Sequence, residues 1–164
     1  MDMEEWQSLF CQSTHFKSNP FHPLVWIIGT PEIGEGVYIG GFSQINGNGA
    51  RVQIGNHCDI ASFVTINCAD SHLRCLGLAE QIKRRDITLE EHVFVGSHSV
   101  IKGGAHIGHH SVIAAGTVVD SGMIPPYSLV SGNPMQVKAG YYRDRFPPDP
   151  EADACTPPLD TERH

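Results

Sequence analysis

Residues 93–119 read VFVGSHSVIKGGAHIGHHSVIAAGTVV, and every sixth residue from Val95 onward is aliphatic. The same interval recurs upstream, in one run that begins at Ile27 and in another that begins at Ile54. Over the whole chain, thirteen positions at this spacing are aliphatic, and ten of them are isoleucine. These positions are Ile27, Ile33, Ile39, Ile45, Ile54, Ile60, Ile66, Leu89, Val95, Ile101, Ile107, Ile113 and Val119. So regular a spacing indicates a structural repeat.

An interval of six residues is typical of short strands joined by tight turns. It matches neither the period of an amphipathic helix nor that of a long strand. The residue after the aliphatic one is Gly, Ala or Asn at nine of the thirteen positions, which suits a bend in the backbone. Three hexads would close one triangular coil, and stacked coils would align the aliphatic side chains in one core. We therefore predict an all-β fold, a parallel β-helix of a little over four coils, with a β-sandwich as the alternative.

The repeat is interrupted at two places. Between Ile45 and Ile54 the phase slips by three residues, which suggests a bulged corner. Between Ile66 and Leu89 the pattern stops, and residues 73–86, LRCLGLAEQIKRRD, predict a protruding loop with one helical turn. The apolar residues of this loop need a partner such as a neighbouring subunit. Its basic residues can face either solvent or phosphate groups.

The pattern divides the chain into three segments. Residues 1–23 form an N-terminal extension with a short helix around Glu4–Phe10. Residues 24–138 form the β-helix domain with the inserted loop 73–86. Residues 139–164 form a Pro-rich acidic tail, which we expect to be disordered or loosely docked from about Arg143 onward.

The composition agrees with a single β-rich domain. The chain has 164 residues, 17 of them Gly and 11 Pro, and a net charge of −7, which disfavours a protein that coats nucleic acid. No apolar run approaches the length of a membrane span, and the acidic N-terminus lacks the basic start of a secretory signal. The five cysteines form no CxxC pair, which favours reduced thiols and a cytoplasmic location.

Residues 93–138 resemble the hexapeptide-repeat acyltransferase superfamily, whose members form left-handed β-helices. The resemblance covers roughly residues 27–138 and is most specific in the closing motifs IPPY, residues 124–127, and SGNP, residues 131–134. It is strongest toward the sugar O- and N-acetyltransferases. It implies a homotrimer that transfers an acetyl group from acetyl-CoA to a sugar hydroxyl or amine. The acceptor that we expect is a nucleotide-linked sugar or amino sugar of surface polysaccharide synthesis.

The resemblance also assigns roles to single residues. A histidine just before the protruding loop acts as general base, and His72 in NCADSH, residues 67–72, occupies that place. Similarity to galactoside acetyltransferase implies that Phe94 and Ser97 lie near the acceptor and the thioester, and Ala115 along the pantetheine arm. Lys138 follows the GNP turn, where the family often has a basic residue for coenzyme A phosphate. The sequence departs from the family at residues 120–121, where Asp-Ser replaces the common Thr-Lys.

The chemistry of the residues themselves suggests further partners for this reaction. Acyl transfer needs a base for the nucleophile, donors for the oxyanion and alignment of the two substrates. Asp70 can orient the ring of His72 or bind the acceptor, and Asn67 can hydrogen-bond a sugar. Backbone N–H groups at Gly96 and Ser97 are candidates for oxyanion donors and so for contact with the coenzyme. Corner residues such as Asn67 and Asp70 also commonly bond their own backbone.

Two other classes of function fit the same scaffold. The γ-class carbonic anhydrases bind zinc on such a helix through three histidines, two of them in an HxxxxH arrangement. This chain has ten histidines, but none of those in the repeat region has that spacing, and we expect no metal. A catalytically silent trimeric scaffold is the third possibility, against which His72 argues.

Overall fold

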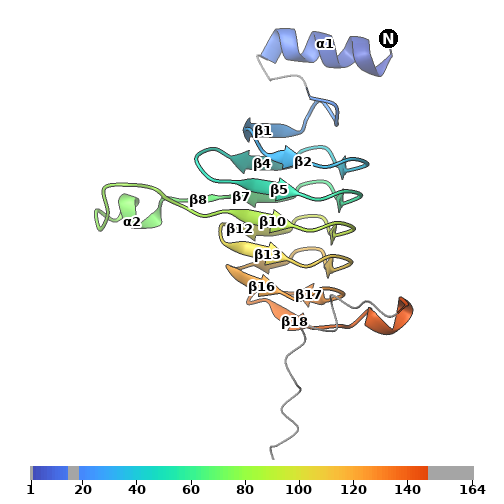
Figure 1. Ribbon diagram of the computed structural model, residues 1–164. Helices are drawn as coiled ribbons and strands as arrows, with labels where there is room; N and C mark the ends of the chain where they lie inside the picture. The colour runs from blue at the N-terminus through green and yellow to red at the C-terminus, as the bar shows by residue number, and fades with distance from the viewer. Residues whose placement is uncertain (1, 15–18, 148–164) are drawn as a thin grey trace, which may run out of the picture.

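The computed structural model, which describes residues 2–14 and 19–147, is a triangular β-solenoid (Figure 1). Three parallel sheets, here called faces A, B and C, form its sides. Face A contains β1 (Trp26–Gly29), β4 (Gln44–Gly47), β7 (Thr65–Asn67), β12 (Val100–Lys102) and β15 (Val118–Val119). Face B contains β2 (Glu32–Ile33), β5 (Val52–Ile54), β10 (Ile87–Leu89), β13 (Ala105–Ile107) and β16 (Gly122–Ile124). Face C contains β3 (Tyr38–Ile39), β6 (Asp59–Ile60), β11 (Phe94–Val95), β14 (Val112–Ile113), β17 (Leu129–Ser131) and the antiparallel β18 (Gln136–Lys138).

Each coil runs through faces A, B and C in turn, so that the solenoid is a left-handed β-helix of five coils. The prediction of a parallel β-helix is thus confirmed, and the alternative of a β-sandwich is wrong. We call the three edges the AB, BC and CA corners, after the faces that they join.

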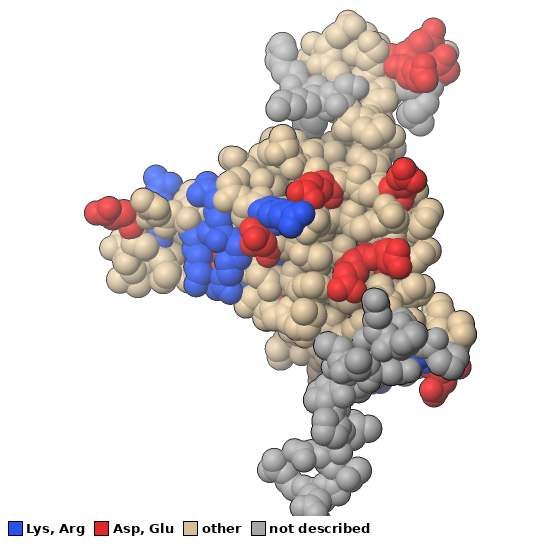
Figure 2. Space-filling model, viewed as in Figure 1, with Lys and Arg blue, Asp and Glu red and all other residues tan. Residues whose placement is uncertain are grey.

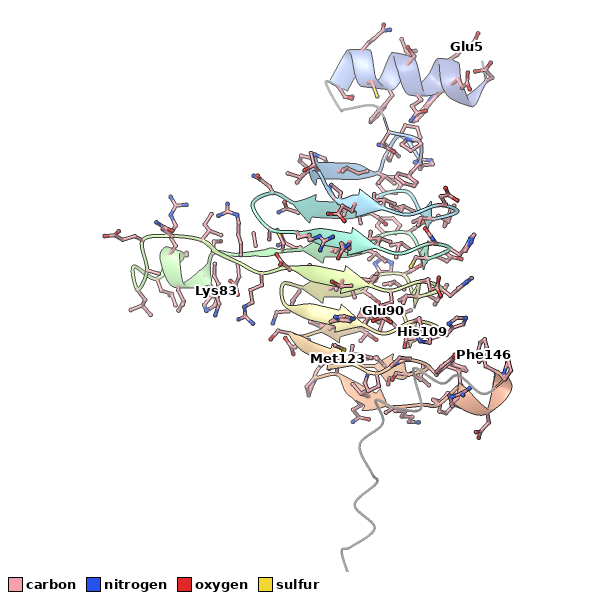
Figure 3. All side chains as sticks on the ribbon, viewed as in Figure 1. Glu5, Lys83, Glu90, His109, Met123 and Phe146 are labelled. Carbon is pink, nitrogen blue, oxygen red and sulfur yellow. The ribbon has the colours of Figure 1, made fainter. Side chains whose placement is uncertain are left out.

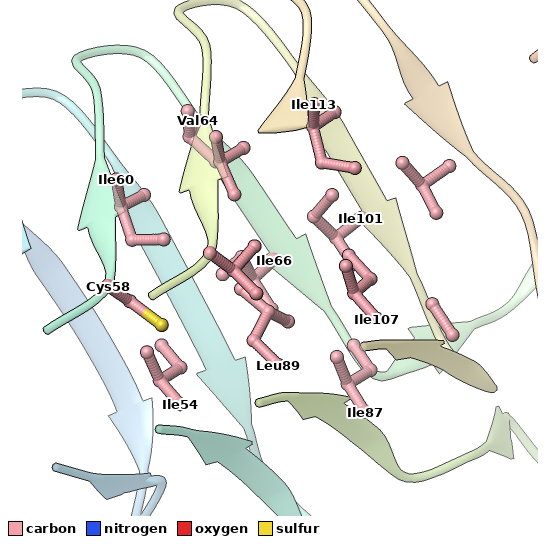
Figure 4. Close-up of a cluster of buried hydrophobic side chains, with 14 of the residues drawn as sticks. Ile54, Cys58, Ile60, Val64, Ile66, Ile87, Leu89, Ile101, Ile107 and Ile113 are labelled. Atoms are coloured by element: carbon pink, nitrogen blue, oxygen red, sulfur yellow. The ribbon is translucent and has the colours of Figure 1, made fainter. Parts of the chain in front are cut away.

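The register aligns the aliphatic residues of the repeat in three columns. On face A, Ile27, Ile45, Ile66, Ile101 and Val119 pair with one another from coil to coil. Most of the thirteen are fully buried, and Ile27 and Ile33 in the first coil are partly buried against the core. Figure 4 shows how these side chains fill the interior. Burial of each one contributes about 1.5–3 kcal/mol to the free energy of unfolding, which makes these columns the main stabilising element.

The core extends further than the hexad count predicts. Ile124 and Val130 continue the columns of faces B and C, and both are buried. The step from Val119 to Ile124 is five residues instead of six, which conceals the continuation in the sequence. The helix therefore completes five coils, and the expectation of a little over four is corrected.

Both interruptions of the repeat lie at the AB corner, in successive coils. The first is a short turn between β4 and β5, and the second is the excursion between β7 and β10 (Figure 1). The stem of the excursion is an antiparallel pair, β8 (Ala69–Asp70) with β9 (Lys83–Arg84). Its outer part contains the short helix α2 (His72–Cys75). The loop projects from the solenoid at the level of the third coil, so that its leucines have little of the core to pack against.

The two ends of the solenoid carry short additional elements. Helix α1 (Met3–Thr14) precedes the first coil. After β18, a 3-10 helix (Arg143–Arg145) leads to Phe146, whose ring lies 5.0 Å from that of Tyr127. The chain is thus packed on the last coil as far as Phe146, beyond the start that we expected for the tail. The rest of the Pro-rich segment, residues 148–164, lies outside the described residues.

Candidate active site

The stem of the protruding loop holds an aspartate–histidine pair. The Nδ1 atom of His72 lies 2.5 Å from Oδ1 of Asp70, and the backbone N–H of His72 donates to the same oxygen over 3.1 Å. The spacing of two residues produces this arrangement, because an aspartate readily bonds the backbone two residues ahead in a turn. The turn thus fixes the position of the histidine at the start of α2.

The pairing determines which nitrogen of His72 is free. An ionised carboxylate has only acceptors, so Nδ1 must carry the proton and Nε2 presents its lone pair outward. The hydrogen bonds from the side chain and backbone of His72, with the positive charge of Lys102, lower the pKa of Asp70. Asp70 therefore stays ionised and holds the ring. Both side chains are open to solvent in the single chain, with exposed fractions of 61% for His72 and 48% for Asp70.

Asn67 ends β7 immediately before this stem. Its Oδ1 accepts hydrogen bonds from Asn46 Nδ2 over 2.9 Å and from the N–H of Ala69 over 3.1 Å. The carbonyl oxygen thus ties two coils together, which is a structural task. The amide NH₂ of Asn67 is the part of the side chain that can still donate to a sugar.

A pocket of about 280 Å³ opens at the AB corner beside the pair. Asn67 and Asp70 line it on one side, and Asp120 and Ser121 lie on another. Its remaining charged residues are cations: Lys83, Arg85 and Lys102. Figure 2 shows the basic side chains gathered between the loop and the body of the solenoid. The pocket therefore combines an amide and a hydroxyl group with a surplus of positive charge, and Asp70 links it to His72, which is not one of its lining residues.

A second group of predicted residues lies at the CA corner. Gly96 and Ser97 form the turn after β11, and Ala115 occupies the equivalent turn one coil later. Phe94 lies at the end of face C that leads into this corner, with an exposed fraction of 40%. The structure thus brings Phe94, Gly96, Ser97 and Ala115 together.

The two groups are not adjacent within one chain. Face A separates them, since β7 and β12 run from the CA corner to the AB corner. At about 3.3 Å per residue, the four steps from Ser99 to Gly103 span about 13 Å. His72 and Ser97 of one chain therefore lie at different edges of the solenoid.

Gly96 has a structural explanation. Its N–H donates to the carbonyl of Ile113 over 2.8 Å, so this amide is not available as an oxyanion donor. A Cβ at this position would lie 2.5 Å from the backbone N of Ala115, so that only glycine fits below the next coil. The expectation for Gly96 as a donor is corrected, and the amide of Ser97 remains the candidate at this corner.

Lys138 lies apart from both groups. It pairs with Leu129 at the start of β17, at the BC end of face C. Its ammonium nitrogen is 5.7 Å from the ring centroid of Tyr141. A role for Lys138 toward coenzyme A phosphate therefore stays a prediction that the geometry of the single chain does not favour.

Sequence reasoning did not assign a role to two charged residues of the pocket, Lys102 and Asp120. Lys102 pairs in register with Asn67, and its Nζ lies 2.5 Å from Oδ1 of Asp120 in the next coil. Arg85, which follows the stem strand β9, is one of the basic loop residues that the sequence offered for phosphate groups. The signal for Lys102 and Asp120 was present, because both directly follow an inward aliphatic residue of face A, as Asn67 does.

Histidines elsewhere in the fold stack rather than converge. At the BC corner, the rings of His57 and His92 are 5.1 Å apart and those of His92 and His110 are 4.7 Å apart. Within residues 2–14 and 19–147, no three His, Cys, Asp or Glu side chains are placed to hold a metal ion. In the same ranges, no helix has the length and apolar character of a membrane span.

Comparison with known proteins agrees with the solenoid. A family profile described as "Bacterial transferase hexapeptide (six repeats)" matches residues 86–121. The crystal structure of a hexapeptide-repeat acetyltransferase from Vibrio cholerae, in complex with acetyl coenzyme A, superposes with a TM-score of 0.65. That protein is 27% identical, and the match covers 84% of this chain and 76% of the other.

Two curated relatives are similar over shorter stretches. The 2,3,4,5-tetrahydropyridine-2,6-dicarboxylate N-succinyltransferase of Xylella fastidiosa is 28% identical over 66% of this chain. The galactoside O-acetyltransferase of Escherichia coli is 45% identical over 51 residues, which are 31% of this chain. The matches cover 40% of the first relative and 25% of the second, so that much of each relative has no counterpart in the aligned region.

Proposed function

Since the chain belongs to the superfamily of hexapeptide-repeat transferases with a left-handed β-helix, we propose that it transfers an acetyl group from acetyl-CoA to a sugar. The observation that carries the proposal is the contact of 2.5 Å between His72 and Asp70 at the base of the protruding loop. The acceptor atom is a hydroxyl or an amine, and the acceptor is a nucleotide-linked sugar or amino sugar of surface polysaccharide synthesis. The reaction takes place in the cytoplasm.

His72 acts as the general base in this proposal. Its free Nε2 takes the proton from the acceptor as the nucleophile attacks the thioester carbonyl, and coenzyme A leaves as the thiol. Asp70 keeps the proton on Nδ1 and stabilises the imidazolium that forms. A histidine suits this task because its ordinary pKa lies near neutrality.

The coenzyme lies along the CA corner of the adjacent subunit. Ala115 is exposed there, and Gly116, with a φ of 71°, leaves open space for a pantetheine arm. The amide of Ser97 is placed to donate to the thioester oxygen, and Phe94 borders the acceptor. A homotrimer would bring this corner against the AB corner of the next subunit, so that each site takes its base from one chain and its coenzyme track from another.

The first test is calorimetric titration of the purified protein with acetyl-CoA, followed by thiol release with a panel of acceptors. We expect saturable binding near one site per subunit, and release of coenzyme A with a nucleotide amino sugar or a glycoside. Absence of acetyl-CoA binding would contradict the proposal and leave a scaffold or, with zinc bound, a metalloenzyme.

The same panel should include succinyl-CoA, because one curated relative is a succinyltransferase. Turnover with succinyl-CoA and none with acetyl-CoA would keep the acyltransferase mechanism but change the acyl group. The ratio of kcat/KM for the two donors decides between them.

A further inference from the structure

Two consecutive arginines at the stem of the loop have different surroundings. The Nε atom of Arg84 donates to the backbone carbonyl of Asn48 over 2.9 Å, and its side chain lies across Gly49 in the preceding coil. Arg85 lies across Gly104 in the following coil, where a Cβ on that glycine would be 3.1 Å from the Cδ of Arg85. Arg84 therefore anchors the loop, whereas no described residue accepts a hydrogen bond from the guanidinium of Arg85 in the structure.

Gly104 makes room for the guanidinium of Arg85. Its φ of 92° lies in the left-handed region, and a side chain there would also meet Ser121 at 2.8 Å. Arg85 is thereby held along the AB corner with its charged end at the pocket, beside Ser121. The five N–H donors of a guanidinium suit two oxygens of one phosphate or carboxylate.

Lys83 adds a second free cation to the same pocket. It pairs with Asp70 in the register of the stem, which places the two side chains on one side of the ribbon. Figure 3 labels Lys83 at the base of the loop. The third cation, Lys102, is compensated by Asp120 at 2.5 Å. His72 is neutral as a base, so its hydrogen bonds orient the carboxylate of Asp70 without cancelling its charge. Arg85 and Lys83 together exceed that one carboxylate and leave the pocket with a surplus of one positive charge.

We propose that this pocket binds an anionic group of the acceptor, a phosphate or a carboxylate, through Arg85 and Lys83. The inference rests on the proposed function and extends it, since it restricts the acceptors to negatively charged sugars. The basic residues are concentrated in this part of the chain: five of the eleven Lys and Arg residues lie between residues 74 and 102, in a chain with a net charge of −7. The positive charge would attract an anionic acceptor to the AB corner, where His72 lies.

The position of Asp70 assigns the anion to the acceptor rather than to the coenzyme. Asp70 lines the pocket and contacts His72, so that a molecule held there lies beside the base. The general base must reach the nucleophilic atom of the acceptor. The coenzyme track of the same chain is a full face away, and the track of the adjacent subunit in the proposed trimer is tested below through the KM for acetyl-CoA.

The kinetic test compares matched acceptors with and without the charge. Glucosamine 1-phosphate is paired with glucosamine, and galacturonate with galactose, so that the phosphate and carboxylate arms are separate. We expect Arg85→Met to raise KM for the charged acceptor in at least one pair by about tenfold and to leave KM for acetyl-CoA unchanged. Lys83→Met should have a smaller effect in the same direction.

Arg74→Met is the matched control, because Arg74 lies in α2 of the same loop, outside the residues that line the pocket. It removes one positive charge without touching the pocket, and we expect no change in either KM. An equal effect of Arg74→Met and Arg85→Met would mean only general charge attraction and would overturn the proposal. So would a rise in KM for acetyl-CoA with Arg85→Met, since the anion would then belong to the coenzyme.

A binding measurement separates failure of this inference from failure of the proposed function. Pyrophosphate and glucuronate are titrated into the full-length wild type and into Arg85→Met, with and without saturating acetyl-CoA. We expect one of the two anions to bind, about tenfold more weakly to the variant, and to keep its affinity when acetyl-CoA is present. No binding of either anion, binding unaffected by Arg85→Met, or displacement by acetyl-CoA would each overturn the inference. Anion binding that depends on Arg85, in a protein that does not bind acetyl-CoA, would support the pocket and refute the acyltransferase.

Discussion

At the scale of single residues, the role that we propose for His72 depends on its contact with Asp70. Alone, an exposed histidine at a loop base is as consistent with a solvated edge as with a base. A carboxylate oxygen 2.5 Å from Nδ1 fixes the tautomer, and thereby leaves Nε2 as the basic nitrogen. The pairing is local, because only one residue lies between Asp70 and His72, and the sequence could therefore predict it.

His72→Ala should abolish most of the turnover and leave the fold intact, because the side chain is exposed and contributes nothing to the core. We expect kcat to fall by about 10²- to 10⁴-fold, the usual contribution of a general base. Acetyl-CoA affinity and the melting temperature serve as controls and should not change. Turnover equal to that of the wild type would refute the assigned role.

Asp70→Asn should lower turnover by about tenfold or more, because an amide can donate to Nδ1 and so stabilise the wrong tautomer. The lowered pKa of Asp70 means that its ionised form is favoured in the folded chain. The stabilisation of the folded chain by the ionised carboxylate is fully present above the ordinary pKa of a carboxyl, about 4. It is lost only as the pH falls through the lowered pKa of Asp70.

The effect of Asp70→Asn is therefore measured in kcat/KM from pH 6 to 9. The deficit should persist at the alkaline end of this range, because it reflects the orientation of the ring rather than its charge. A deficit that disappears by pH 9 would show that Asp70 acts only through the charge of the ring.

Glycines show the limit of sequence reasoning at this scale. Gly96 and Gly104 are both corner glycines, yet the first is required by the backbone of Ala115 and the second by its left-handed φ and by the side chains of Ser121 and Arg85. Arg85 reaches Gly104 from a loop 19 residues earlier in the chain, and such a contact follows only from the path of that loop. The sequence marked the basic residues of the loop but not which of them the fold leaves free.

At the scale of elements, the repeat predicts the strands and their inward faces because each inward residue is set by a fixed interval. The prediction failed where the interval changed. Ile124 and Val130 are buried, but the six-residue interval does not predict them, because the step across the AB corner before Ile124 is one residue short. The packing of Phe146 on Tyr127 was missed because it depends on contact between segments with no periodicity.

Gly104→Ala tests the contact between the stem and the following coil. We expect it to lower the free energy of unfolding by about 1–3 kcal/mol, because the left-handed φ and the nearby atoms of Ser121 and Arg85 both oppose a side chain. Gly77→Ala is the matched control, since Gly77 has a φ of 72° but no atom within 4 Å of a Cβ. Thermal unfolding should place Gly104→Ala about 2–4 °C or more below Gly77→Ala. Equal melting temperatures would mean that the close contacts of residue 104 with Ser121 and Arg85 do not affect the free energy of unfolding.

At the scale of the whole molecule, the separation of the two residue groups is the strongest argument for an assembly. The proposed base and anion pocket lie at the AB corner, and the residues proposed for the coenzyme lie at the CA corner, with face A between them. Rotation about an axis parallel to the solenoid keeps every residue at its own level along that axis, so it can bring the AB corner of one subunit against the CA corner of the next. Under the proposed function, a complete site would therefore need two chains.

Two exposed apolar surfaces of the chain are consistent with such an assembly. Leu76 and Leu78 of the loop are 67% and 72% exposed. At the CA corner, the exposed rings of Phe42 and Phe63 stack at 5.0 Å, and His98 continues the stack at 4.9 Å. Contiguous exposed apolar surface usually marks an interface. We therefore expect light scattering to give a trimer, and we expect that removing residues 74–82 weakens it.

Complementation between two inactive variants tests the shared site directly. His72→Ala removes the base, and Ala115→Trp blocks the coenzyme track at an exposed position where the core is not disturbed. In a trimer whose sites combine the AB corner of one subunit with the CA corner of the next, every mixed trimer contains one site with both residues intact. Random co-assembly should then restore about a quarter of the wild-type activity. The measurement is thiol release after the two variants are unfolded and refolded together, with each variant refolded alone as the control. If both residues served a site within one chain, the mixture would remain as inactive as its components, because no assembly could unite an intact His72 with an intact Ala115.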